Sequence, residues 1–173
     1  MPKLYDLQYG RKFSMMDDDV IAMADSYDGY ASWQIRIANY GLLIEQVEFR
    51  QCDGKPLEEF NVELPDGYVE SLQQKAMSVG FASFPNQFET KIDIFMALSY
   101  TLVIRTEGEL KRVHFRQGAD WEGEQGLMIE KFDELWDMVH LHAPYPRDLP
   151  NKVRTKRQLK MDARRERRHG KED

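Results

Sequence analysis

The sequence predicts an α+β fold: a four-stranded or slightly larger antiparallel sheet from two strand–strand–helix units, with helices on one face. Three observations lead to this prediction: an internal repeat, strands with alternating apolar residues, and two segments with helical spacing. Residues 47–51 (VEFRQ) return as residues 113–117 (VHFRQ), and residues 32–37 (SWQIRI) align with residues 99–104 (SYTLVI). Each copy is followed by a polar turn and an amphipathic segment, so a repeated supersecondary unit is expected.

A short helix over residues 14–24 is expected before the first unit. Three aspartates, residues 17–19, stand in its first turn, where the positive end of a helix favours negative charge. Val20, Met23 and Ala24 give this segment an apolar side.

The first unit begins with a strand over residues 33–37, whose alternation of apolar and polar residues is typical of a half-buried strand. Gly41 marks the turn, and residues 44–50 form the returning strand with Val47 and Phe49 inward. Residues 57–64 are ambiguous, and one interpretation is a further short edge strand.

The helix of the first unit is expected to start at Pro65, where a missing N–H costs nothing, and to end at Gly80. Its apolar positions follow helical spacing: Val69, Leu72, Ala76 and Val79. Residues 81–85 (FASFP) are expected to pack the chain back onto the body, and residues 88–96 to connect to the second unit.

The second unit repeats this plan. Tyr100, Leu102 and Ile104 match the inward residues of the first unit, and Gly108 lies in a tight turn that aligns with Gly41. On the returning strand, Arg112, His114 and Arg116 are expected to point outward, between the inward residues Val113 and Phe115. A polar loop over residues 118–126 then leads to a helix with an apolar stripe: Phe132, Leu135, Trp136 and Val139.

Charge divides the chain into an acidic body and a basic tail. Of the 24 Lys and Arg residues, 11 follow residue 146, whereas only 5 of the 30 Asp and Glu residues do. We therefore expect three parts: an N-terminal extension (1–30), the duplicated domain (31–146) and a basic tail (147–173). Such asymmetry informs on binding partners rather than on fold.

Several classes of protein are disfavoured. The N-terminus lacks the apolar core of a signal peptide, and no apolar run approaches the roughly 20 residues of a membrane span. A single cysteine, Cys52, cannot form an internal disulfide, which fits a reducing compartment. We therefore expect a soluble, cytoplasmic protein with no membrane partner.

The order of core and turn residues resembles emfourin-type small proteins, which are proteinaceous inhibitors of a metalloprotease. The resemblance covers about 110 residues and concerns mostly core and turn positions, which specify fold more than activity. Its residues are Leu72, Ala76, Gly80, Phe81, Phe84, Pro85, the 100–104 strand, Gly108, the 113–115 strand, Leu135 and Val139. It implies an inhibitor-like binding protein, but the short N-terminal helix and the basic tail depart from that family's plan, and no inhibitory motif is carried over.

No catalytic, cofactor or metal motif stands out. Residues 17–19 with Asp25 and Asp28 lack the spacing of a calcium loop, and His140 and His142 lack a further zinc ligand. Cys52 has no neighbouring group that would stabilise a thiolate for a nucleophilic role with His114 or His140. Walker, G-x-G-x-x-G and G-x-S-x-G patterns are absent, so we expect a non-enzyme without a metal or cofactor.

Two charged clusters at equivalent places in the repeats suggest a surface for a protein with a basic patch, although charge runs are commonly only solvated faces. The predicted partner-binding residues are Glu58, Glu59, Glu63 and Asp66 in the first unit, and Glu130, Asp133, Glu134 and Asp137 in the second.

The tail provides the alternative function, a nucleic-acid-associated protein, because its side chains can neutralise phosphates. Contact with an acidic protein surface, or a purely solubilising role, remain open at this point. The candidate residues are Lys152, Arg154, Lys156, Arg157, Lys160, Arg164, Arg165, Arg167 and Arg168. The leading hypothesis is a protein-binding module of inhibitor, immunity or regulatory type that acts through its acidic surface.

Overall fold

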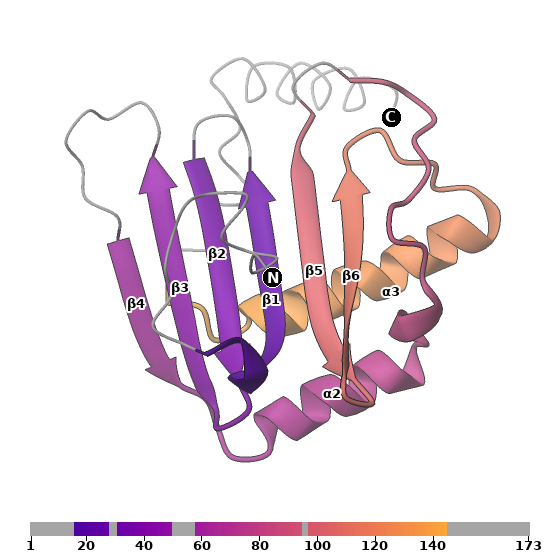
Figure 1. Ribbon diagram of the computed structural model, residues 1–173. Helices are drawn as coiled ribbons and strands as arrows, with labels where there is room; N and C mark the ends of the chain where they lie inside the picture. The colour runs from indigo at the N-terminus through magenta and orange to yellow at the C-terminus, as the bar shows by residue number, and fades with distance from the viewer. Residues whose placement is uncertain (1–15, 28–30, 50–57, 95–96, 145–173) are drawn as a thin grey trace, which may run out of the picture.

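The computed structural model describes residues 16–27, 31–49, 58–94 and 97–144. These residues form an α+β structure with a six-stranded antiparallel sheet in the order β4-β3-β2-β1-β5-β6, together with two α-helices (Figure 1). The strands are β1 (Val20–Tyr27), β2 (Ala31–Ala38), β3 (Leu42–Phe49), β4 (Glu58–Glu63), β5 (Ser99–Thr106) and β6 (Glu109–Arg116), and the helices are α2 (Tyr68–Ser78) and α3 (Gly123–His140).

The helix expected over residues 14–24 is wrong, because this region contains strand β1. Only Asp17–Asp19 form a single 3-10 turn, and the apolar run from Val20 to Ala24 lies in the middle of the sheet between β2 and β5. A strand buried on both faces has apolar residues in succession rather than in alternation, so its pattern resembles that of a buried helix.

The two repeated segments form hairpins on either side of β1, within the same sheet. Their turns differ: residues 39–41 make the first loop, with Gly41 at φ 83°, whereas Glu107 and Gly108 make a two-residue turn with φ 51° and 85°. Trp33 consequently pairs with Val47, but the aligned Tyr100 pairs with Phe115. The hairpins therefore keep the same inward faces while their registers differ by two residues.

The sheet is larger than the expected four strands because β1 and β4 join the two hairpins. The interpretation of residues 57–64 as an edge strand is confirmed, since β4 pairs with β3 at one edge of the sheet. At the other edge, the backbone of His114 in β6 accepts a hydrogen bond from Phe88 and donates one to Asn86. The segment after α2 thus satisfies backbone groups that an edge strand would otherwise expose.

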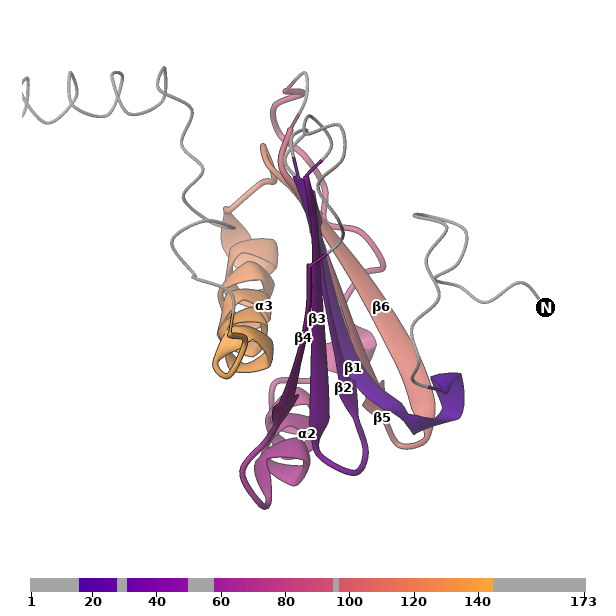
Figure 2. The same cartoon turned by 90° about the vertical axis from the view of Figure 1, so that its left-hand side faces the viewer.

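Both helices lie on one face of the sheet, as expected (Figure 2). The predicted stripes of both helices belong to the main apolar core, together with alternating residues of the strands. Helix α2 begins at Tyr68, three residues after Pro65, because Pro65 and Asp66 form a turn that ends in Gly67 at φ 76°. Gly80 follows the helix in the left-handed conformation, and Phe81 and Phe84 return to the core as expected.

The opposite face of the sheet is also largely buried. The strand predicted over residues 33–37 is confirmed as part of β2, but the prediction that it is only half-buried is wrong. Gln34 and Arg36, which point away from the helices, are each only 5% exposed. One residue from each strand contributes to a continuous line across this face, which we call the polar row. Its members, in consecutive cross-strand register, are Glu59, Gln46, Gln34, Asp25, Thr101 and His114.

Candidate functional site

The structure separates the two predicted acidic clusters. In the second, Glu130, Asp133, Glu134 and Asp137 are exposed on α3, on the side away from its buried stripe; we call this side the acidic helix face. In the first, Glu58, Glu59 and Glu63 are exposed on edge strand β4, and Asp66 is exposed in the turn before α2. Register places Glu59 and Glu63 on the sheet face opposite the helices, so the clusters point in different directions.

The acidic helix face borders a pocket of about 340 Å³. It lies between α3, the paired strands β5 and β6, and the loop that precedes α3. Five aromatic side chains and two carboxylates line this aromatic pocket: Tyr100, Phe115, Trp121, Phe132, Trp136, Asp133 and Asp137. Its lining therefore combines π surfaces with negative charge.

Simple periodicities pair these residues within each element. Phe132 and Trp136 are four residues apart on α3 and therefore adjacent, as are Asp133 and Asp137. Tyr100 and Phe115 are direct cross-strand partners on the helix-covered face. The pocket thus lies where a helix turn faces a pair of strands.

The aromatic rings form a connected cluster. Phe115 stacks against Phe132 with ring centroids 6.0 Å apart, and Phe132 stacks against Trp136 at 6.1 Å. The rings of Tyr100 and Trp136 are arranged edge to face with centroids 5.3 Å apart, and those of Trp121 and Phe115 edge to face at 6.1 Å. Phe132 and Trp136 are buried, whereas Trp121 is 52% exposed and forms the accessible rim.

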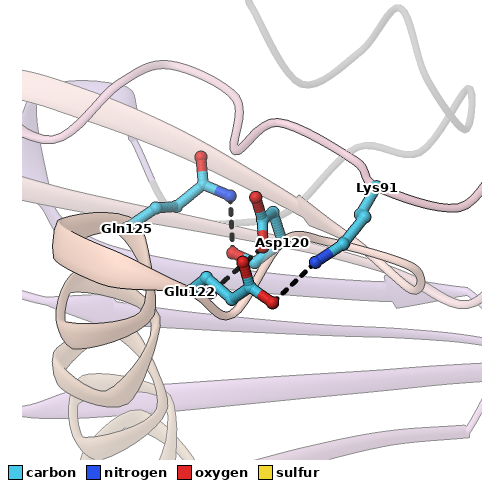
Figure 3. Close-up of polar contacts among 4 residues, drawn as sticks. All are labelled: Lys91, Asp120, Glu122 and Gln125. Atoms are coloured by element: carbon cyan, nitrogen blue, oxygen red, sulfur yellow. Dashed lines mark hydrogen bonds and ion pairs between the residues drawn. The ribbon is translucent and has the colours of Figure 1, made fainter.

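A set of polar contacts holds the loop that carries Trp121 (Figure 3). The Gln125 side chain donates to the backbone carbonyls of Asp120 (2.7 Å) and Glu89 (2.9 Å), and its oxygen accepts from the Glu89 amide at 2.9 Å. Lys91 Nζ pairs with Glu122 Oε1 at 2.7 Å, and the Glu122 amide donates to Asp120 Oδ1. These contacts, which we call the Gln125 clamp, fix the backbone on both sides of Trp121.

Gly126 completes this arrangement from within α3. A Cβ atom at this position would lie 2.0 Å from the carbonyl oxygen of Trp121, which is far inside van der Waals contact. Only glycine allows the loop to lie this close to the first turn of the helix. The position of Trp121 is therefore determined by the local backbone as well as by the Gln125 clamp.

The electrostatics of the pocket centre on Asp133. Burial of its carboxyl group against the pocket, and then the neighbouring carboxylate of Asp137, raise the pKa of Asp133 to about 6. The residue as a whole remains exposed, so only part of the side chain is removed from water. Two carboxylates on adjacent turns beside aromatic rings repel one another, and a bound cation would relieve this repulsion.

Sequence reasoning found the carboxylates of this site but not its aromatic wall. Tyr100, Phe115, Phe132 and Trp136 have the spacing of core residues, and Trp121 lies in residues 118–126, which the sequence predicts to be a polar loop. Trp121 is flanked by Asp120 and Glu122, and a tryptophan between acidic residues is the local signal that could have identified an exposed ring.

His140 and His142, the two histidines considered as metal ligands, each contact another residue of the protein. His140 is 9% exposed, and its Nδ1 lies 2.7 Å from the carbonyl oxygen of Trp136, so that nitrogen carries the proton and donates. His142 meets the ring of Tyr68 edge to face at 4.6 Å. Within residues 16–27, 31–49, 58–94 and 97–144, no three His, Cys, Asp or Glu side chains are grouped so that they could hold a metal ion.

Other predicted residues lie outside the described part of the chain. These are Cys52, Asp28 and the tail residues Lys152, Arg154, Lys156, Arg157, Lys160, Arg164, Arg165, Arg167 and Arg168. Neither of the two described helices is long and apolar enough to cross a membrane. No protein-family model matches the chain, and no curated protein sequence matches it.

Proposed function

We propose that this protein is a non-enzymatic protein-binding module whose acidic helix face binds a basic surface of another protein. The observation that supports this proposal is the pair Asp133 and Asp137, which share one side of α3 and one pocket and repel each other there. A cationic partner would relieve this repulsion on binding. Opposite charges on the two surfaces would also speed their encounter.

The edge strand β4 makes a weaker case for the same role. Its exposed carboxylates lie on a sheet edge, where charged side chains commonly prevent pairing with strands of other molecules. Glu59 also accepts a hydrogen bond from Gln46 at 2.5 Å and so belongs to the polar row. We therefore assign partner binding to the acidic helix face and edge protection to β4.

Capture from native extract with matched charge variants tests the proposal. The helix variant carries Asp133→Asn, Glu134→Gln and Asp137→Asn, and the control carries Glu58→Gln, Glu59→Gln and Glu63→Gln, which remove the same charge from β4. We expect a protein that is retained by the natural chain and the β4 variant but lost with the helix variant. Its association rate, measured after purification, should fall about tenfold in the helix variant and fall with added salt.

Equal capture by all three proteins, with salt-independent association, would contradict the proposal. Glu134 forms an ion pair with Lys75 at 2.5 Å, so the helix variant also loses one contact between α3 and α2. A version that changes only Asp133 and Asp137 separates the binding effect from that contact.

The basic tail supports a second candidate function, association with nucleic acid. The supporting observation is the concentration of 11 of the 24 basic residues after residue 146. Binding of this kind depends steeply on salt because it releases counterions. A gel-shift titration of duplex DNA and RNA should show binding by the full chain and a loss of binding when the chain ends at Pro150; equal affinity of the two chains would reject it.

A further inference from the structure

The lining of the aromatic pocket restricts the chemistry of what it can bind. A neutral apolar group would remove the carboxylates of Asp133 and Asp137 further from water without compensation, which is costly. An anion would be repelled by the same two groups. A cation that can also lie against aromatic rings satisfies both parts of the lining, because the face of an aromatic ring attracts positive charge.

Among organic cations, the guanidinium group matches this lining best. It is planar and stacks on aromatic rings, and its N–H groups donate to carboxylate oxygens in a fixed fork. A quaternary ammonium offers no N–H to the carboxylates, and a lysine ammonium offers no flat surface to the rings. Arginine also commonly anchors protein interfaces.

We propose that the aromatic pocket receives the guanidinium group of an arginine side chain on the partner protein. This inference rests on the proposed function and names the contact at its centre. Trp121 provides the exposed surface for stacking, and Asp133 and Asp137 accept hydrogen bonds from the guanidinium N–H groups. At about 340 Å³, the pocket is at the small end of ligand sites and is large enough for one side chain.

The structure holds the proposed contacts in place before binding. Gln125 fixes the backbone beside Trp121, and Gly126 allows that loop to approach α3. Phe132 and Trp136 are buried beneath the pocket and limit movement of the helix turn that carries the carboxylates. Because the backbone that carries these groups is already held in place, less conformational entropy is lost when the guanidinium enters.

The test uses the full chain and Nα-acetyl-arginine methylamide, a small probe whose only charge is the guanidinium. NMR titration follows the indole signal of Trp121 and the carboxyl signal of Asp133. We expect saturable shifts of both with a Kd of about 1–10 mM, as suits a single side chain. The matching citrulline derivative, which has nearly the same shape but no charge, should produce no saturable shift.

Variants locate the contact. Trp121→Ala should weaken probe binding about tenfold. Trp121→Phe should keep most of the affinity, because it retains an aromatic ring and the backbone contacts of the loop hold that ring in the same place. Asp133→Asn should weaken binding by a similar factor. Glu70→Gln is the matched control, since it removes one exposed charge from α2, outside both the pocket and the acidic helix face, and it should leave the Kd within about twofold.

Three results with the small probes would overturn the inference. One is equal binding of the citrulline derivative, and another is unchanged binding after Trp121→Ala. The third is tighter binding of tetramethylammonium or of the lysine derivative than of the arginine probe. A partner whose capture depends on Asp133 and Asp137 but not on Trp121 would reject the arginine pocket and leave the proposed function standing. If the probe binds but no such partner is found, the proposed function fails, and the pocket retains only an affinity for a guanidinium group.

Discussion

The two faces of the sheet bury their residues in different ways. On the helix-covered face, β2 and β5 contribute Ile35, Ile37, Leu102 and Ile104 to one large apolar core with both helices. On the opposite face, the polar row crosses all six described strands, and a small apolar cluster lies beside it. Ile44 and Met23 of that cluster are as well buried as the main core.

This difference suggests a division of roles between the faces. The main core provides most of the apolar burial, which is the dominant stabilising contribution to folding. The polar row instead restricts strand register, since a slip of two residues would place Thr101 opposite Met23 and break the line of polar side chains. The helix-covered face thus stabilises the sheet, and the opposite face helps to select one pairing of its strands.

The largest effect is expected from a matched pair of substitutions, Ile104→Ala and Ile44→Ala. Both side chains are 1% exposed or less, but Ile104 lies in the main core and Ile44 beside the polar row. Denaturant unfolding should show a loss of about 4 kcal/mol for Ile104→Ala and about 2 kcal/mol for Ile44→Ala, because polar neighbours can admit water into the second cavity. Equal losses would mean that the two faces are packed alike.

A smaller effect on stability is expected from Asp133, which lines the aromatic pocket on the helix-covered face. Its pKa of about 6 in the folded protein exceeds the unfolded value, so the folded state holds more protons between about pH 4 and pH 6, and stability falls as pH rises through this window. Asp133→Asn should therefore raise the free energy of unfolding at pH 7 by at most about 1 kcal/mol after allowance for solvent screening. The gain should vanish near pH 4.

The groups that face Asp133 provide the control. Asp137 is the charged neighbour on α3, and Tyr100 is the titratable neighbour from β5. Asp137→Asn should lower the pKa of Asp133, as measured by its carboxyl NMR signal. A loss of stability in Asp133→Asn at pH 7 would show instead that the carboxylate makes a net favourable contact in the folded protein.

The smallest effect is expected in the polar row, at His114. Burial, followed by the charges of Arg112 and Arg116, lowers the pKa of His114, and its Nδ1 lies 3.0 Å from Thr101 Oγ1. The unfolded chain therefore binds a proton more readily, and stability falls as pH drops below the unfolded value of about 6.5. His114→Gln keeps a polar partner for Thr101 and should make the free energy of unfolding less dependent on pH below about 6.5. If this pH dependence is unchanged, other groups are responsible for the acid sensitivity.

Regular patterns predicted much of the fold. The stripes of α2 and α3, the ends of both hairpins at Gly41 and Gly108, and the return of residues 81–85 to the core all depend on local periodicity or on backbone freedom of glycine. The carboxylates of the candidate site were also visible, because residues four apart on a helix are neighbours by construction. These features need no knowledge of distant contacts.

The chain by itself therefore determined two hairpins, two helices and a row of acidic side chains on the last helix. Tertiary structure decided that residues 20–24 form the middle strand, because only neighbours on both sides and cover on both faces distinguish a central strand from a buried helix. It also decided the aromatic pocket. The pocket combines residues from separate elements: Trp121 from the loop before α3, Tyr100 and Phe115 from β5 and β6, and Asp133 from α3. These residues come together because of how α3 crosses the sheet, which no local pattern specifies.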